Sequence, residues 1–214
     1  MEQKIREKID IFFSSYPSRQ FKKNEIVLRP EEEISSIYLL KEGFVRMYVL
    51  SEQGQEVTLH IFKPVSFFPI MLVLSTVKNK YFFEAMENLS LIKAPADDTL
   101  AFLKSNPEVL FDLTHRLSDA LCGFLLRTED LMLQHSHAKV ASLLLYLAKH
   151  LGKTATNNVF VPFALTHEDL ASWLGLTRET VSRQIEDLTK KNIIAYKNHR
   201  IIIKDIEKLI IEAS

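Results

Sequence analysis

Apolar residues recur at helical spacing toward both ends of the chain and at strand spacing between them. Near the N-terminus, Ile5, Ile9, Phe12 and Phe13 stand among charged residues at positions i, i+4, i+7 and i+8. This spacing predicts an amphipathic helix over residues 4–15. The next part of the chain, to about residue 95, has short alternating or apolar segments separated by polar turns, which predict a small antiparallel barrel or sandwich. The expected strands are residues 25–28, 36–40, 45–50, 57–62, 82–87 and 89–94.

A long helical pattern follows the expected strands. Asp97 or Asp98 is expected to cap a short helix that runs through Leu103, and Pro107 is well placed to open a longer helix. The apolar seam of the longer helix is wide enough to pack one side on the β unit and another on a second copy of itself. We therefore favour dimerisation through residues 107–135 over a single core helix. The seam consists of Leu110, Leu113, Leu117, Ala120 or Leu121, Phe124, Leu125 and Leu131 or Met132.

The seam is interrupted at residues 134–137, which form a candidate hinge. A further helix is expected from Ala138 to Leu151, because its apolar residues share one face. Residues 153–158 predict a polar loop, and residues 159–163 predict a strand or an extended arm.

Two short helices separated by a tight turn are predicted after this arm. Thr166 is a natural N-cap and Asp169 can complete a capping box, so the first helix should begin near His167. Gly175 supplies the conformational freedom that a sharp turn requires. Thr177 caps the second helix. The buried face of that helix should consist of Val181, Ile185 and Leu188.

The outward face of the second helix has the chemistry of a DNA recognition helix. Arg178, Glu179, Ser182 and Arg183 can together donate to guanine O6 and N7, accept from cytosine N4 and bind phosphates. A generic helical hairpin with a solvated charged face is the alternative. Two correctly spaced caps and a glycine turn favour the DNA-binding interpretation.

A strand-turn-strand wing is predicted after the second helix. Residues 193–196 and 200–204 are largely apolar and flank a polar turn at 197–199. The wing adds His199 and Arg200 to the residues expected near DNA.

Composition limits the function classes. The chain of 214 residues carries a formal net charge of +0, but residues 136–214 carry +3 and the remainder carries −3. The positive balance therefore lies in the part that has the predicted helix-turn-helix, as a surface that faces phosphates requires.

The same composition offers little support for catalysis or metal binding. The single cysteine, Cys122, excludes an intramolecular disulfide, and we expect it to be a small core residue. No Ser/His/Asp arrangement or metal-ligand spacing stands out, so an enzyme is not expected and neither is a metal site. We also expect no membrane span and a cytoplasmic location, because the apolar runs at 70–74 and 143–147 are short and no signal-peptide pattern is present.

Three stretches carry a resemblance to a known family. They are LTHEDLASWLGLTRETVSRQIEDL, NIIAYKNHRIIIKD and SSIYLLKEGFVRMYVLSEQGQEVTL. With the order of elements, they resemble the Crp/Fnr family of bacterial transcription regulators over nearly the whole chain. The resemblance implies an α+β architecture. It would comprise a β-roll sensor like cyclic-nucleotide-binding domains over residues 1–106, a dimerisation helix over 107–135 and a winged helix-turn-helix over 136–214.

The resemblance also implies how DNA is read. The base-reading positions of the cyclic-AMP receptor branch correspond here to Arg178, Glu179 and Arg183, which implies a half-site of the TGTGA type. Ser182 next to Arg183 is similar to the oxygen-sensing branch. Double-stranded DNA and a second copy of the chain are the expected partners, with RNA polymerase as a further candidate. The full set of expected DNA-binding residues is Thr166, Thr177, Arg178, Glu179, Ser182, Arg183, His199 and Arg200.

The sensor half departs from the cyclic-AMP pattern. Residues 67–70 read Phe-Phe-Pro-Ile where that branch has a Gly-Glu for ribose, and Asn79-Lys80 replace its Arg-Ser pair for phosphate. Apolar Ile70 cannot accept from ribose hydroxyls, and Asn79 cannot give a charged bidentate contact to phosphate. We therefore expect either no effector or a hydrophobic small molecule. The candidate pocket residues are Phe62, Phe67, Phe68, Lys80, Phe82 and Phe124.

No cofactor is expected. Haem ligation would need His60, His115, His135 or His137, which are too scattered in the sequence to indicate a site. The cysteine cluster of the oxygen-sensing branch is missing, and Lys78 or Lys80 could contact an anion only as a point charge. The remaining alternative to a DNA-binding regulator is a ligand-binding signalling module whose C-terminal part binds a protein.

Overall fold

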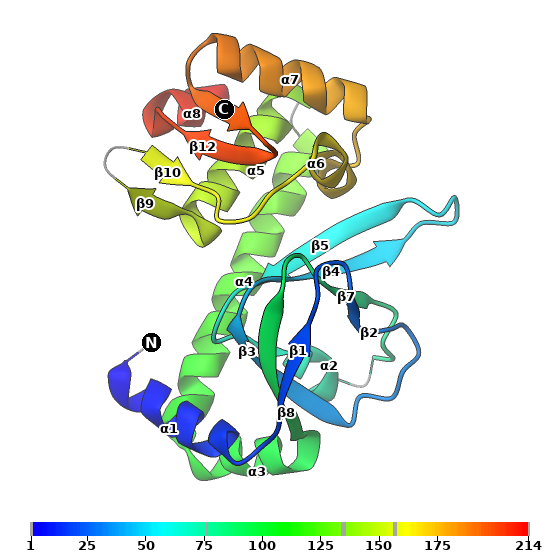
Figure 1. Ribbon diagram of the computed structural model, residues 1–214, viewed down its shortest axis with the longest axis vertical. Coiled ribbons are helices and arrows are strands. Elements are labelled where there is room, and N and C mark those ends of the chain that lie inside the picture. The colour runs from blue at the N-terminus through cyan, green and yellow to red at the C-terminus, as the bar shows by residue number, and fades with distance from the viewer. Residues whose placement is uncertain (1, 76, 134–135, 156–157, 214) are drawn as a thin grey trace. The chain divides into compact units, whose positions relative to one another are not determined.

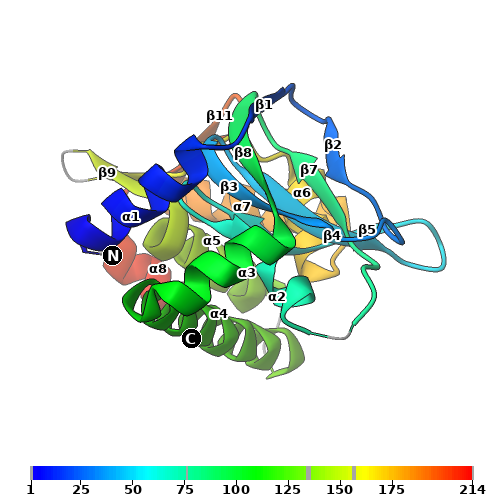
Figure 2. The same ribbon diagram turned by 90° about the horizontal axis from the view of Figure 1, so that it is seen from below.

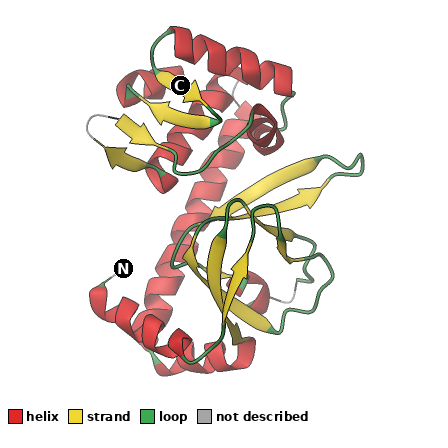
Figure 3. Cartoon of the chain, in the orientation of Figure 1, coloured by secondary structure: helices red, strands yellow, loops and turns green. Residues whose placement is uncertain are grey.

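The structure, a computed structural model, describes residues 2–75, 77–133, 136–155 and 158–213. The chain divides into two compact units, one of residues 1–49 with 59–122 and the other of residues 50–58 with 123–214. Strands build most of the first unit, and helices surround a small sheet in the second (Figure 3).

Two four-stranded sheets form the β-roll of the first unit (Figure 1). Each pairing that has an assigned register within them is antiparallel. The first sheet has the order β1 (Ser18–Phe21), β8 (Leu89–Pro95), β3 (Ser36–Glu42) and β6 (Phe67–Phe68). The second has the order β2 (Ile26–Leu28), β7 (Phe82–Ala85), β4 (Val45–Leu50) and β5 (Glu56–Phe62). The expected antiparallel barrel or sandwich is therefore confirmed.

Strand β3 is buried on both faces. Tyr38 and Leu40 point into the core between the two sheets, together with Phe68 of β6. Ile37 and Leu39 point to the opposite face and join a second apolar cluster. Because side chains alternate along a strand, a run of four apolar residues serves two cores at once.

Helices cover the outer face of the first sheet (Figure 2). The cluster beneath them contains Ile9 and Phe13 of α1, Leu103 of α3, and Val109 and Leu113 of α4. These helices are α1 (Gln3–Ser14), α3 (Ala96–Ser105) and the first half of α4 (Pro107–Leu133), and a short helix α2 (Ile70–Val73) follows β6. The amphipathic N-terminal helix and the helix start at Pro107 are thus confirmed.

The second unit combines the end of α4 and four further helices with a third antiparallel sheet among its described residues. The sheet has the order β11 (Ile194–Lys197), β12 (Arg200–Ile203), β10 (Asn158–Phe160) and β9 (Lys153–Ala155). The helices are α5 (Ser136–Leu151), α6 (His167–Leu174), α7 (Arg178–Lys190) and α8 (Ile206–Glu212).

Several local expectations were wrong. Pro95 occupies the N-cap of α3 without a side-chain hydrogen bond, and Asp97 and Asp98 lie in the first turn, where their charges favour the helix dipole. Lys153–Ala155 is a strand because it pairs with β10, not a polar loop. Cys122 is exposed and is not a core residue.

Other features were missed or fall outside the description. No pattern in the sequence indicated β1, α2 or α8. The candidate hinge lies partly outside the described residues, since only Ser136 and His137 are described, and they open α5. Among the described helices, none is long and apolar enough to cross a membrane.

Two glycines allow a prediction about stability. Gly175 ends α6 with φ 62°, and a Cβ there would meet no heavy atom within 4 Å. Gly175→Ala should therefore lower the free energy of unfolding by about 1–2 kcal/mol, because of the left-handed backbone alone, and Gly175→Asn should lower it less. Gly152→Ala should lower it more than Gly175→Ala does, because the new Cβ at position 152 would lie 2.3 Å from the carbonyl oxygen of Ala148. Urea unfolding tests this order, and an equal cost at both positions would contradict it.

Candidate nucleic-acid interface

Helix α6 begins with the predicted capping box. The Thr166 hydroxyl accepts from the Asp169 amide at 3.1 Å, and the Asp169 carboxylate accepts from the Thr166 amide at 2.7 Å. The Thr166 hydroxyl also donates to the same carboxylate at 2.7 Å. At the other end, the left-handed Gly175 stops the helix. The two ends fix where α6 begins and where the chain turns toward α7.

Helix α7 separates a buried face from an exposed one. Thr177 caps it by accepting from the Thr180 amide at 3.2 Å, as predicted. The predicted buried residues Val181, Ile185 and Leu188 are at most 2% exposed. Arg178, Glu179 and Arg183 are exposed, and Ser182 is half-buried.

The exposed side chains of α7 are available to a ligand. Among the residues that the structure describes, neither Glu179 nor Arg183 takes part in an ion pair or a side-chain hydrogen bond. A guanidinium and a carboxylate on one exposed helix face match the donor and acceptor pattern of base edges in the major groove.

The wing is a two-residue hairpin. Asn198 and His199 have φ values of 52° and 60°, as a type I′ turn between β11 and β12 requires. The wing is joined to the start of α6, because the Tyr196 hydroxyl lies 2.9 Å from the Leu165 carbonyl oxygen and donates to it. The Leu165 amide in turn donates to the His199 carbonyl oxygen at 2.7 Å. Arg200 is exposed and donates to the Pro162 carbonyl oxygen at 3.3 Å.

An aromatic contact between α6 and the wing was missed in the sequence. The rings of His167 and Tyr196 stack with centroids 4.7 Å apart. Burial lowers the pKa of His167 below its ordinary value of 6.5, and the nearby charges of Arg178 and His199 lower it further. The two stacked residues are 29 positions apart, and no local pattern predicts such a contact.

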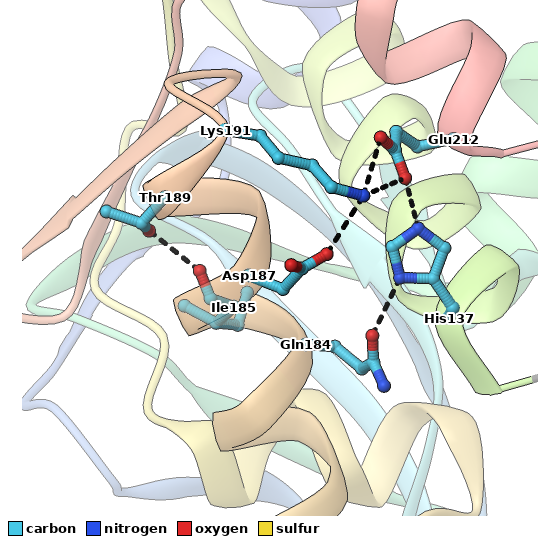
Figure 4. Close-up of polar contacts among 7 residues, drawn as sticks. All are labelled: His137, Gln184, Ile185, Asp187, Thr189, Lys191 and Glu212. Atoms are coloured by element: carbon cyan, nitrogen blue, oxygen red, sulfur yellow. Dashed lines mark hydrogen bonds and ion pairs between the residues drawn. The ribbon is translucent and has the colours of Figure 1, made fainter.

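A polar network joins α7 to α5 and α8 (Figure 4). Nδ1 of His137 lies 2.7 Å from Oε1 of Gln184, and Nε2 of His137 contacts the Glu212 carboxylate. The Lys191 ammonium donates to both Glu212 oxygens at 2.9 and 3.0 Å and pairs with Asp187 at 3.0 Å. Ligand atoms of His137, Asp187 and Glu212 lie within 4.8 Å of one another, a spacing that suits a metal ion. In this structure the positive charge between the carboxylates of Asp187 and Glu212 is the Lys191 ammonium.

Asn79 and Ile70, which replace the nucleotide-contacting residues of the cyclic-AMP branch, are engaged in contacts within the sensor half itself. Asn79 is 5% exposed, and its side chain donates to the Arg29 carbonyl oxygen at 2.7 Å and accepts from the Tyr81 amide at 3.0 Å. Ile70 is buried in the cluster beneath the helices. Both ends of the Asn79 amide therefore stabilise the loop that carries it.

The expected pocket residues do not line one cavity. Phe68 packs between the sheets with Phe62 at a ring distance of 5.2 Å, whereas Phe67 lies in the cluster on the opposite face. Phe82 stacks on Tyr48 at 5.0 Å, Lys80 is exposed, and Phe124 is 54% exposed in the second unit. The candidate haem ligands are equally dispersed: His60 packs on Phe62, His115 pairs with Asp119, His137 belongs to the network above and His135 lies outside the described residues.

The two halves of the chain match two known domain families. Residues 18–106 match the cyclic nucleotide-binding domain, and residues 138–210 match the Crp-like helix-turn-helix domain. Among characterised proteins, the global nitrogen regulator of Nostoc sp. is 26% identical over 86% of this chain and 83% of its own length. The transcriptional regulator SdrP of Thermus thermophilus is 29% identical over 88% of this chain and 90% of its own length.

Solved structures extend the likeness to three dimensions. A transcriptional regulator of the CRP/FNR family from Thermus thermophilus superposes with a TM-score of 0.74 at 28% identity, over 92% of this chain and 98% of that one. A CooA mutant from Carboxydothermus hydrogenoformans superposes with a TM-score of 0.78 at 25% identity, over 94% and 89%. Both superpositions cover most of each chain, so the likeness spans the two matched domains.

His167 predicts how stability depends on pH. Because its pKa is lowered on folding, the unfolded chain binds the proton more readily, and stability should fall as pH drops through the ordinary value of 6.5. His167→Gln should reduce the decrease in melting temperature between about pH 7.5 and about pH 5.5. The loss of ring stacking would lower the melting temperature at every pH, so the informative quantity is the slope of the melting temperature against pH. Parallel curves for the variant and the wild type would contradict the prediction.

Proposed function

This chain belongs to the Crp/Fnr family of transcriptional regulators, and we propose that it acts as a homodimer that reads an inverted-repeat operator through Arg178, Glu179 and Arg183. The characterised relatives are regulators and not enzymes. A cytoplasmic location, where DNA is accessible, fits this role. RNA polymerase is the further partner through which such a regulator would act, and the position of the operator would decide between activation and repression.

The observation that carries the proposal is the exposed face of α7. Arg183 can donate two hydrogen bonds to guanine O6 and N7, and Glu179 can accept from cytosine N4. Ser182 and Arg178 stand beside them and can bind phosphate or base. Thr166, Thr177, His199 and Arg200 lie at the helix starts and on the wing, where contacts to the DNA backbone would fix the register.

The exposed apolar side chains of α4 support the homodimer. At about 100° per residue, five of them fall within an arc of roughly 100°, and such an apolar face is typical of a helix-helix interface. Two copies related by a two-fold axis would place half-sites about one turn of DNA apart, ~34 Å. These five side chains are Leu110, Leu121, Phe124, Leu125 and Met132, which are 38 to 79% exposed, whereas the exposed Phe111 and Leu126 lie outside the arc.

The regulator is proposed to work without a cyclic nucleotide. The Asn79 amide is committed to its own loop, and Ile70 is buried, so neither offers the polar groups that ribose and a cyclic phosphate need. Either the operator affinity is constitutive, or a small molecule of another kind shifts it. Such a molecule would have to bind the DNA-competent state more tightly than the other state.

Selection of bound duplexes from a random pool, with purified protein and no added ligand, tests the proposal directly. Enrichment of an inverted repeat with G·C pairs in each half-site is the expected result. Absence of duplex binding at low salt would instead favour a module that binds a protein partner.

Base reading by Arg183 can be separated from phosphate binding. Arg183→Ala should weaken operator binding by about 1–3 kcal/mol and retain most of the affinity for an unrelated duplex. Fluorescence anisotropy at several salt concentrations measures both affinities. Arg19→Ala, which removes an exposed arginine from β1, is the matched control and should change neither. An equal loss on both duplexes would argue against base reading.

Dimerisation can be tested on the same arc of α4. Leu121→Glu combined with Phe124→Glu should convert the dimer to a monomer, because charges would replace apolar side chains in the interface. Light scattering after size exclusion measures the mass. Asp119→Lys is the control, since Asp119 is exposed on the same helix roughly 170° from the centre of the arc. A double variant that stays dimeric would show that α4 is not the interface.

A further inference from the structure

Five side chains from three helices form what we call the polar clasp: His137 of α5, Gln184, Asp187 and Lys191 at α7, and Glu212 of α8. They are neither fully buried nor freely solvated. The side chain of Glu212 is 19% exposed, that of His137 is 32% exposed and that of Lys191 is 43% exposed. Solvent therefore screens these contacts only in part.

The clasp and the core hold α7 on different sides. At about 100° per residue, Gln184, Asp187 and Lys191 form a stripe roughly 90° away from the buried stripe. The outward stripe that contains Glu179, Ser182 and Arg183 lies roughly 120° away on the other side of the clasp. One stripe of α7 is therefore packed in the apolar core, a second makes the hydrogen bonds and ion pairs of the polar clasp, and a third is open to solvent.

The two restraints differ in kind. Val181, Ile185 and Leu188 are aliphatic, and apolar burial has no directional preference. Hydrogen bonds depend on distance and angle, so contacts from His137 and Glu212 resist rotation of α7 about its own axis. A roll of about 20° would move side-chain tips at a radius of about 5–6 Å by roughly 2 Å. That displacement exceeds the range over which a hydrogen bond to a base edge keeps its strength.

His137 lies between two partners of the clasp. Its Nδ1 lies against the Gln184 amide and its Nε2 against the Glu212 carboxylate. The Lys191 ammonium lies against the carboxylates of both Asp187 and Glu212. The pKa of Glu212 is lowered, chiefly by the hydrogen bond from Lys191 and further by His137. The carboxylate therefore stays charged and keeps both of its partners.

We propose that the polar clasp fixes the roll of α7, and that His137 is a positioning residue for DNA reading although it does not itself lie on the DNA-facing stripe. The inference rests on the proposed function of α7. His137 is the second residue of α5, close to the end of the dimerisation helix α4 in the sequence. Gln184 therefore connects the recognition helix to the first turn of the helix that leads into the DNA-binding unit.

The test compares operator and unrelated duplexes for His137→Ala, Gln184→Ala and the double variant. Each single substitution should weaken operator binding about tenfold, the scale of one hydrogen bond, and should change binding to the unrelated duplex less than about twofold. The double variant should lose little more than either single variant, because both remove the same contact. His137→Gln should recover most of the loss, since its amide can donate to Glu212 and bond to Gln184.

Controls separate this inference from loss of folding and from failure of the proposed function. Glu212→Gln should weaken operator binding, whereas Glu207→Gln, the same change at an exposed position of α8, should not. Arg183→Ala must lose operator binding in the same assay, and if the wild type selects no operator the proposed function fails first. Unchanged operator affinity in His137→Ala, or equal loss on both duplexes, would overturn the positioning role. Loss of wild-type affinity in EDTA would replace it with a metal site at the same residues.

Discussion

The proposed DNA-reading surface of the second unit depends on the turn between α6 and α7. Helix α6 must stop at Gly175 and α7 must begin at Thr177, because the intervening turn sets the angle between them. A left-handed glycine and two hydroxyl caps meet this requirement with short, local hydrogen bonds. The apolar stripes of both helices then pack inward, and the charged residues of α7 remain outside. A residue that resists positive φ at this turn would keep the charges of α7 but would make their arrangement less stable.

Local signals accounted for much of the fold. Three predicted features depend only on residues that are close in the sequence, so a short segment is enough to predict them. They are the capping box at Thr166, the positive φ at Gly175 and the turn at Asn198 and His199. Alternation along the strands predicted the antiparallel barrel or sandwich for the same reason. The exposed face of α7 was predicted as well, because helical spacing alone assigns Arg183 to the side opposite Val181.

Contacts between distant segments could not be predicted in this way. Phe67 and Phe68 were grouped as pocket residues, but adjacent strand residues point to opposite faces, and each belongs to a different core. The role of Asn79 depends on the Arg29 carbonyl, and the stacking of His167 depends on Tyr196. Cys122 stands in a helix that is apolar in sequence, yet its position falls between the packed face and the apolar arc. These contacts and exposures are set by the packing of distant segments, so no pattern among neighbouring residues predicts them.

The contacts that hold α7 on two sides have a consequence for the thermodynamics of DNA binding. A recognition helix that is ordered only on DNA would lose its conformational entropy at that moment, and its affinity would be lower for the same contacts. Here the packed core and the contacts from His137 and Glu212 order the helix during folding. Binding to DNA would then be a docking of preorganised groups, with a small entropic cost in the protein. The affinity would depend mainly on how well the duplex itself can adapt to a fixed reading surface.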